Sequence, residues 1–202
     1  FNSGGAWLRA ELRGGHISLP QILRASWGLL RYRLGETNLE PLIRDAIQTQ
    51  AGQSEDALRT RTQLFFQRQV KGRWRPGGLK VLESTRRLGD ECVLLTAASI
   101  YLAREVVESL GLDDALATRL EVGADGRFTG RVHGPLCFGA GKLTLAQSYA
   151  ESRGTRLRNC TFYTDSFSDR PTLEAVGSPV AVHPDRKLKR LAMKMNWPIE
   201  LW

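Results

Sequence analysis

The chain has 202 residues, of which 42% are hydrophobic and 8% aromatic, which suits one globular domain with a modest insertion. It contains no uncharged apolar run of about 18 residues, which excludes a transmembrane helix and integral membrane association. Its net charge of +8 lies mostly in residues 1–75, where 12 basic and 6 acidic residues give +6. That charge would steer an anionic substrate or form an ordinary solvated surface, and no aromatic-interleaved motif favours nucleic acid as a partner.

Residues 1–72 are predicted to be helical throughout. Ser18, Asn38 and Ser54 suit helix N-caps, and apolar residues follow each of them at helical spacing. Such stripes are typical of a small helical bundle. Proline and glycine in residues 73–78 then interrupt the helical pattern and predict a linker.

The pattern changes after residue 78, where helices and strands alternate. A tight turn at Gly126 predicts a short hairpin between residues 117–122 and 127–129. The alternation predicts an α/β fold, with a parallel sheet covered by helices on both faces. The predicted helices lie near 78–88, 100–110, 140–153, 169–176 and 185–195, and the predicted strands near 91–96, 117–122, 159–164, 179–183 and 198–202.

Two carboxylates stand four residues apart after the predicted strand 159–164. Asp165 would lie at the tip of that strand, and Asp169 would open the next helix. Ligands of open α/β sheets bind at this edge, and two hard carboxylate oxygens suit Mg²⁺. A loop aspartate followed by a helix-capping aspartate is the plainer interpretation of the same pattern.

A hydroxyl and an ammonium are expected at the same edge of the sheet. Thr96 ends the predicted strand 91–96, and Lys142 lies near the start of the predicted helix 140–153. A hydroxyl can donate to a phosphoryl oxygen, while a lysine neutralises charge on the transferring group. Together with the two carboxylates, these groups can hold a phosphate and a divalent cation.

The order of these residues resembles motifs two, three and four of the haloacid dehalogenase superfamily of phosphatases. The resemblance is closest to the phosphoserine-phosphatase-like branch, subfamily IB, and covers essentially the whole chain. The segments that carry it are Leu95–Ser99, Lys142 and Thr164–Asp169, with further matches at Arg75–Gly77, Asp125–Gly130, Leu173–Val176 and Val182–Asp185.

The resemblance implies a Rossmann-like core over residues 73–202 and a small helical cap over residues 1–72. It implies a Mg²⁺-dependent phosphomonoester hydrolase that acts on a small phosphorylated metabolite through an aspartyl-phosphate. The implied roles are phosphate binding by Thr96, Ala97 and Lys142, and substrate contact by Asn2 and Ser3. Asp165 and Asp169 are implied as the metal residues: Asp165 would bind the metal directly, and Asp169 would support it through water or by holding Lys142.

One family motif does not occur in this sequence. Family members begin with a strand ending in Asp-x-Asp-x-Thr, which supplies the nucleophile and forms the middle of the sheet. We therefore expect residues 1–202 to lack the central first strand and to be inactive without it. A truncated sequence or an N-terminus assigned too far downstream would account for the missing motif. A non-catalytic binding module that kept the fold is the alternative.

Other residues give weaker signals. Cys92, Cys137 and Cys160 lack metal-ligand spacing and are expected to be reduced, buried thiols of a cytoplasmic protein. Within the resemblance, His183 stands where relatives usually have Asn, and Thr164 where they usually have Gly or Ser. The bulk of Thr164 is expected to alter the geometry near the metal carboxylates.

Overall fold

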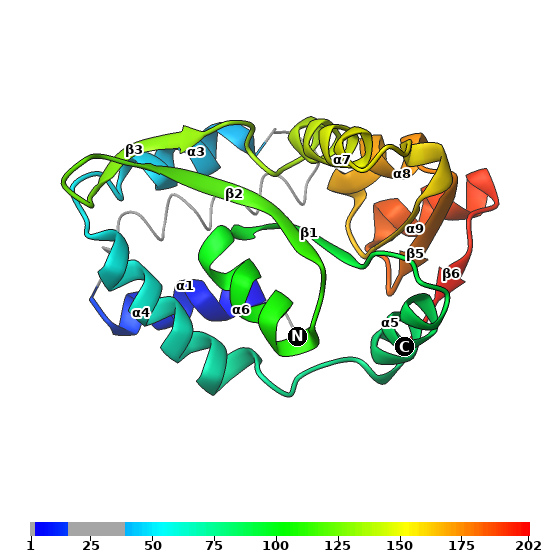
Figure 1. The fold of residues 1–202 in the computed structure, drawn as a ribbon, viewed down its shortest axis with the longest axis horizontal. Helices are drawn as coiled ribbons and strands as arrows, with labels where there is room; N and C mark the ends of the chain where they lie inside the picture. Colours follow the sequence, from blue (N-terminus) through cyan, green and yellow to red (C-terminus); the bar gives the residue numbers. More distant parts are fainter. Residues whose placement is uncertain (1–2, 16–38) are drawn as a thin grey trace.

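The computed structural model describes residues 3–15 and 39–202. The expected caps Ser18 and Asn38, and the expected substrate contact Asn2, lie outside the described residues. Within the described ranges, no helix is long and apolar enough to cross a membrane. Figure 1 shows two groups of elements, with the N-terminal helices beside one sheet and the C-terminal helices beside another.

The described N-terminal elements are helical, as predicted. The Ser54 hydroxyl caps α4 by accepting a hydrogen bond from the Ala57 amide at 3.4 Å. Trp7 of α1 packs edge-to-face on Phe65 of α4, with ring centroids 5.1 Å apart. The elements are α1 (Ser3–Arg13), α3 (Glu40–Gln48), α4 (Glu55–Phe65) and the π-helical turn η1 (Phe66–Val70).

The first sheet has three strands, in the order β1-β2-β3. β1 and β2 are parallel, with Val93 opposite Asp114, and β2 and β3 form the antiparallel hairpin predicted around Gly126. Its elements are β1 (Val93–Ser99), α6 (Ile100–Leu110), β2 (Asp114–Val122) and β3 (Phe128–His133). The helix before β1, α5 (Pro76–Arg87), lies beside β6 (Ile199–Glu200) of the second sheet (Figure 1).

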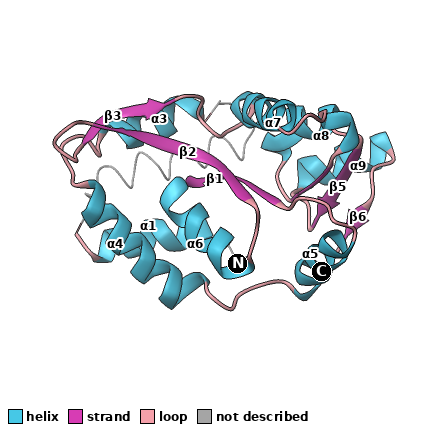
Figure 2. Ribbon diagram, viewed as in Figure 1, coloured by secondary structure: helices cyan, strands magenta, loops and turns pink. Residues whose placement is uncertain are grey.

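The second sheet contains β4, β5 and β6, all parallel. Its helices cover a core of Leu173, Ala181, Leu188 and Ala192, each at most 1% exposed. Figure 2 shows these strands between their helices. The elements are α7 (Ala140–Ser152), β4 (Thr161–Thr164), the 3-10 turn η3 (Phe167–Asp169), α8 (Arg170–Ala175), β5 (Ser178–Val182), α9 (Arg186–Met195) and β6 (Ile199–Glu200).

The prediction of one parallel sheet therefore holds only in part. Among the described residues no ladder joins β1 to β4, so each has a strand partner on one side alone. β3 is antiparallel because a tight turn reverses the chain after β2. The positions of the predicted helices and strands after residue 78 are confirmed to within a few residues.

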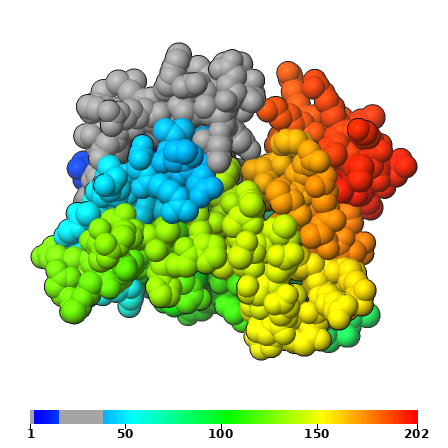
Figure 3. All heavy atoms as spheres, turned by 90° about the horizontal axis from the view of Figure 1, so that it is seen from above, coloured from blue at the N-terminus to red at the C-terminus, as the bar shows by residue number. Residues whose placement is uncertain are grey.

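The hairpin ties the N-terminal helices to the first sheet. The Gly52 amide donates to the Phe128 carbonyl at 2.8 Å, and the Phe128 amide donates to the Gln53 carbonyl at 3.0 Å. The Tyr101 hydroxyl of α6 donates to Glu55 of α4 at 3.0 Å. In the space-filling view α3, in blue, lies against the green hairpin (Figure 3). A domain boundary at residue 72 stays a prediction.

His183 follows β5 with a left-handed backbone, at φ +43°. Its amide donates to the Glu200 carbonyl at 2.8 Å, which holds the turn against β6. Residues other than glycine, asparagine and aspartate adopt this conformation at a cost of about 1–2 kcal/mol. Asparagine, which the resemblance implies at this position, adopts this backbone at a lower cost than histidine.

Exchange of His183 tests this backbone strain. Both His183→Asn and His183→Ala remove the imidazole, so their difference isolates the backbone preference. We expect the asparagine variant to unfold with a free energy about 0.5–1 kcal/mol higher than the alanine variant, measured by urea denaturation. Equal stability of the two variants would show that the turn is not strained.

Candidate active site

A buried ion pair lies at the centre of the candidate site. Lys142 Nζ donates to Asp169 Oδ2 at 2.8 Å, and the two side chains are only 8% and 3% exposed. Asp169 precedes α8, yet its side chain makes no capping hydrogen bond. The helix-capping interpretation of this aspartate is therefore wrong, because its carboxylate is committed to the lysine.

The start of α7 explains how the lysine reaches that position. Gly139 takes a left-handed φ of +52° just before the helix. A Cβ on Gly141 would lie 1.9 Å from the Leu136 carbonyl oxygen, a distance that no side chain tolerates. These two glycines let the chain turn tightly into α7, which places Lys142 in the first turn of the helix, facing inward.

Thr164 contributes a contact that the sequence analysis missed. Its hydroxyl donates to Asp169 Oδ2 at 2.6 Å, and the Ser168 hydroxyl donates to Oδ1 at 3.3 Å. Asp169 thus accepts from one ammonium and two hydroxyls. The Thr164 hydroxyl therefore orients the Asp169 carboxylate. The sequence analysis considered only the bulk of Thr164.

Asp165 directly follows β4, as predicted, and its surroundings differ from those of Asp169. It is exposed, and its carboxylate makes no hydrogen bond or ion pair with the described residues. Its carbonyl accepts from the Asp185 amide at 2.9 Å. The loop is therefore fixed through its backbone, while the Asp165 carboxylate keeps its oxygens available for a hard cation such as Mg²⁺.

Asp185 anchors this loop from the far side. Its Oδ2 accepts from the Phe167 amide at 2.8 Å, and its Oδ1 accepts from the amides of Lys187 and Leu188 in the first turn of α9. The sequence analysis noted Asp185 only as part of a family match. Its position just before a basic helix was the available signal for such a cap.

Thr96 and Ala97 lie where β1 loses its regular pairing. The register with β2 shifts between Thr96 and Ser99, and the Thr96 hydroxyl accepts from the Ala98 amide at 3.2 Å. Ala97 is exposed at this irregularity. A break of this kind turns backbone groups out of the ladder, which frees them for a ligand.

Cys137 lies near both Thr96 and Lys142. It is fully buried, its amide donates to Thr118 Oγ1 at 3.1 Å, and its thiol donates to the Leu116 carbonyl at 3.3 Å. Burial raises the pKa of this thiol to about 11, against the opposing effects of the Lys142 ammonium and the Thr96 backbone. Of the three free thiols, Cys92 is buried too, whereas Cys160 is only half-buried.

No group of three or more potential metal ligands from His, Cys, Asp and Glu occurs among the described residues. A cation at Asp165 would thus need further oxygen ligands from elsewhere. Ser3 opens α1 and is half-buried, and its contact with a substrate stays a prediction. The structure brings Lys142, Thr164 and Asp169 together.

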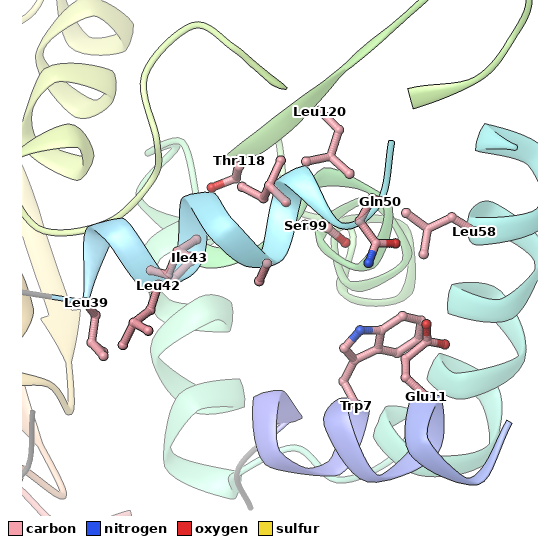
Figure 4. A pocket seen from close by; sticks show the side chains of 13 residues that line it. Trp7, Glu11, Leu39, Leu42, Ile43, Gln50, Leu58, Ser99, Thr118 and Leu120 are labelled. Atoms are coloured by element: carbon pink, nitrogen blue, oxygen red, sulfur yellow. The ribbon is translucent and has the colours of Figure 1, made fainter. Parts of the chain in front are cut away.

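A pocket of about 360 Å³ lies between the N-terminal helices and the first sheet. Its described lining includes Ala97 but not the Lys142–Asp169 pair. Its lining residues come from α1, α3 and α4 and from β1 and β2 (Figure 4). Ala97 and Ser99 of β1 both line it, so the pocket begins next to Thr96. The lining is mostly apolar.

Comparisons with known proteins agree on the family. The model of the haloacid dehalogenase-like hydrolases matches residues 1–174. Phosphoserine phosphatase SerB1 of Mycobacterium tuberculosis is 39% identical over 127 residues, which cover 59% of this chain and 41% of that relative. The chain therefore belongs to the haloacid dehalogenase-like hydrolases and is phosphoserine-phosphatase-like among them.

Two further relatives match almost the whole chain. Histidinol-phosphatase of Neisseria meningitidis is 28% identical over 202 residues, covering 98% of this chain and 91% of that protein. A crystal structure of a protein of unknown function from Bordetella pertussis Tohama I superposes with a TM-score of 0.85 at 26% identity, covering 99% of this chain and 92% of that one. The α/β fold of the family is thus shown.

Substitution of the buried ion pair should affect stability strongly. Lys142→Met leaves the Asp169 carboxylate buried without its cation, and Asp169→Leu leaves the ammonium unpaired. Each single variant should lose about 3–5 kcal/mol of unfolding free energy, whereas the double variant should lose much less. Urea denaturation of all three measures this, and additive losses would contradict a paired interaction.

The buried Cys137 thiol should make stability fall at alkaline pH. Its pKa rises from 9.0 to about 11 on folding, so the folded protein retains the proton that the unfolded chain releases. The stabilising effect is complete below pH 9.0 and is lost as pH rises through about 11. Denaturation midpoints of Cys137→Ala should fall less over this interval. An unchanged slope would mean that Cys137 does not contribute.

Proposed function

We propose that residues 1–202 form the phosphate-binding and metal-binding part of a Mg²⁺-dependent phosphomonoester hydrolase. The observation that carries this proposal is the contrast between two aspartates after β4. Asp169 is buried against Lys142, whereas Asp165 is exposed with a carboxylate free of described partners. The similarity to the phosphoserine phosphatase SerB1 and to the Neisseria histidinol-phosphatase supports a small phosphorylated metabolite as the substrate.

In this proposal Asp165 holds the cation directly, and Asp169 acts by holding Lys142. Magnesium, when bound, supplies positive charge that polarises the phosphoryl oxygens. The Asp165 carboxylate fits that ion because it is a hard oxygen donor with no competing described partner. Lys142 Nζ keeps two further N–H donors beyond its bond to Asp169, and these suit a phosphoryl oxygen.

The backbone at Thr96 and Ala97 completes the proposed phosphate site. The hydroxyl of Thr96 accepts from the Ala98 amide, so its own proton is free to point to a phosphoryl oxygen. Cys137 packs behind this turn and carries no charge at neutral pH, because its pKa is raised to about 11. It would therefore position Thr96 without competing for the phosphate.

The nucleophile is the part that residues 1–202 do not supply. The family forms an aspartyl-phosphate on the first aspartate of Asp-x-Asp-x-Thr, and the printed sequence contains no such motif. β1 and β4 each lack a strand partner on one side among the described residues. A strand carrying the motif would fit beside them. The second candidate is a non-catalytic phosphate-binding module.

Turnover of p-nitrophenyl phosphate with Mg²⁺ separates these two candidates. We expect none from residues 1–202, and turnover once a strand ending in Asp-x-Asp-x-Thr precedes residue 1. In that active form Asp165→Asn should lower kcat by roughly 10²–10³, since the cation that would stabilise charge on the transferring group loses its carboxylate ligand. Asp45→Asn, an exposed aspartate of α3, is the matched control.

Turnover by residues 1–202 that Asp165→Asn abolishes would mean that the nucleophile lies within them. Failure of the extended form to turn over any phosphomonoester, while inorganic phosphate still binds, would favour the binding module instead.

A further inference from the structure

The pocket beside Ala97 carries an inference about the substrate. We propose that the alcohol part of the substrate is an uncharged, largely apolar group that binds in this pocket, rather than an amino acid. This inference rests on the proposed function, because it takes the phosphoryl group to lie at Thr96 and Lys142. The similarity to the phosphoserine phosphatase SerB1 covers 41% of that relative, so it does not by itself assign phosphoserine as the substrate of this chain.

One wall of the pocket is the apolar face of α3, which the described residues cover only in part. α3 directs an apolar stripe at helical spacing toward the pocket, yet none of its residues is fully buried. Figure 4 shows its side chains opposite Trp7 of α1 and Leu58 of α4. The stripe consists of Leu39, Leu42, Ile43, Ala46 and Ile47.

The position and size of the pocket suit a substrate group. Ala97 lines it and directly follows Thr96, so a phosphate ester bound at Thr96 would extend into it. Its volume of about 360 Å³ lies within the range of small-molecule sites, roughly 300–1,000 Å³. Leu120 of β2 and Leu58 of α4 add to its apolar lining.

Charge in the pocket argues against an amino acid. Glu11 is the one ionisable residue among the described lining residues, and its side chain is only 6% exposed. Arg61 already donates to both of its oxygens, at 3.3 and 3.4 Å, and to Gln53 Oε1 at 3.2 Å. This pair is neutral overall and its members are committed to each other.

An amino-acid substrate would bring an ammonium and a carboxylate into this pocket. Burying each charge without a partner is unfavourable, and pairing them requires the substrate to separate Glu11 from Arg61. The remaining polar groups among the described lining residues are the neutral side chains of Trp7, Gln50, Ser99 and Thr118. They can accept or donate single hydrogen bonds to a hydroxyl or an ether, which fixes an uncharged alcohol in place.

Calorimetric titration with Mg²⁺ present compares three probes: hexyl phosphate, O-phosphoserine and inorganic phosphate. We expect hexyl phosphate to bind at least about tenfold more tightly than either other probe, because only its chain fills the pocket. Ile43→Asp should remove that advantage and leave inorganic phosphate unchanged. Leu64→Asp, on an exposed part of α4 outside the pocket, should change neither affinity.

Two results would overturn the inference while the phosphate site stands. In the first, hexyl phosphate binds no better than inorganic phosphate, so the pocket is only an apolar gap between helices and sheet. In the second, O-phosphoserine binds most tightly and Arg61→Met abolishes its advantage, so a zwitterion separates Glu11 from Arg61. Asp165→Asn tests the phosphate site by itself: it should weaken all three probes and preserve the order of their affinities.

Discussion

The buried ion pair between Lys142 and Asp169 holds together parts of the molecule that the described sheets leave separate. No strand ladder joins β1 to β4 among the described residues, so the alignment of the two sheets depends on side chains and on α7. α7 packs against β1, β2 and α8, and its first turn carries Lys142. An ammonium paired at 2.8 Å in a buried place tolerates little displacement, because separation would leave two unpaired charges.

In the loop after β4, Asp165 and Asp169 have different surroundings because the backbone directs one side chain outward and the other inward. Asp185 fixes the loop through the Phe167 amide and the Asp165 carbonyl. Thr164 and Lys142 then draw Asp169 inward, while Asp165 is left in solvent. Only the outer carboxylate is available to a cation, and the inner one determines where the lysine charge lies.

The N-terminal helices and the first sheet together line one pocket. Its boundary contains β1 residues next to the proposed phosphate site and an apolar stripe from α3. The Glu11–Arg61 pair closes one side as a neutral unit. In the proposed function, substrate choice would depend on whether a ligand can use this apolar surface without disturbing the buried ion pair.

The sequence by itself determined the order and limits of most elements, because apolar periodicity, caps and turn residues act locally. It also placed Asp165 at the end of β4 and Lys142 at the start of α7. It left open whether Asp169 supports a metal through water or holds Lys142, 27 residues away, and it could not determine that Arg61 pairs with Glu11, 50 residues away. It gave Thr164, Cys137 and Asp185 no individual role. It predicted a parallel sheet without its central first strand, and the described chain has two separate sheets, the first of them partly antiparallel. Those features depend on which side chains meet across the fold, and only the tertiary structure decides that.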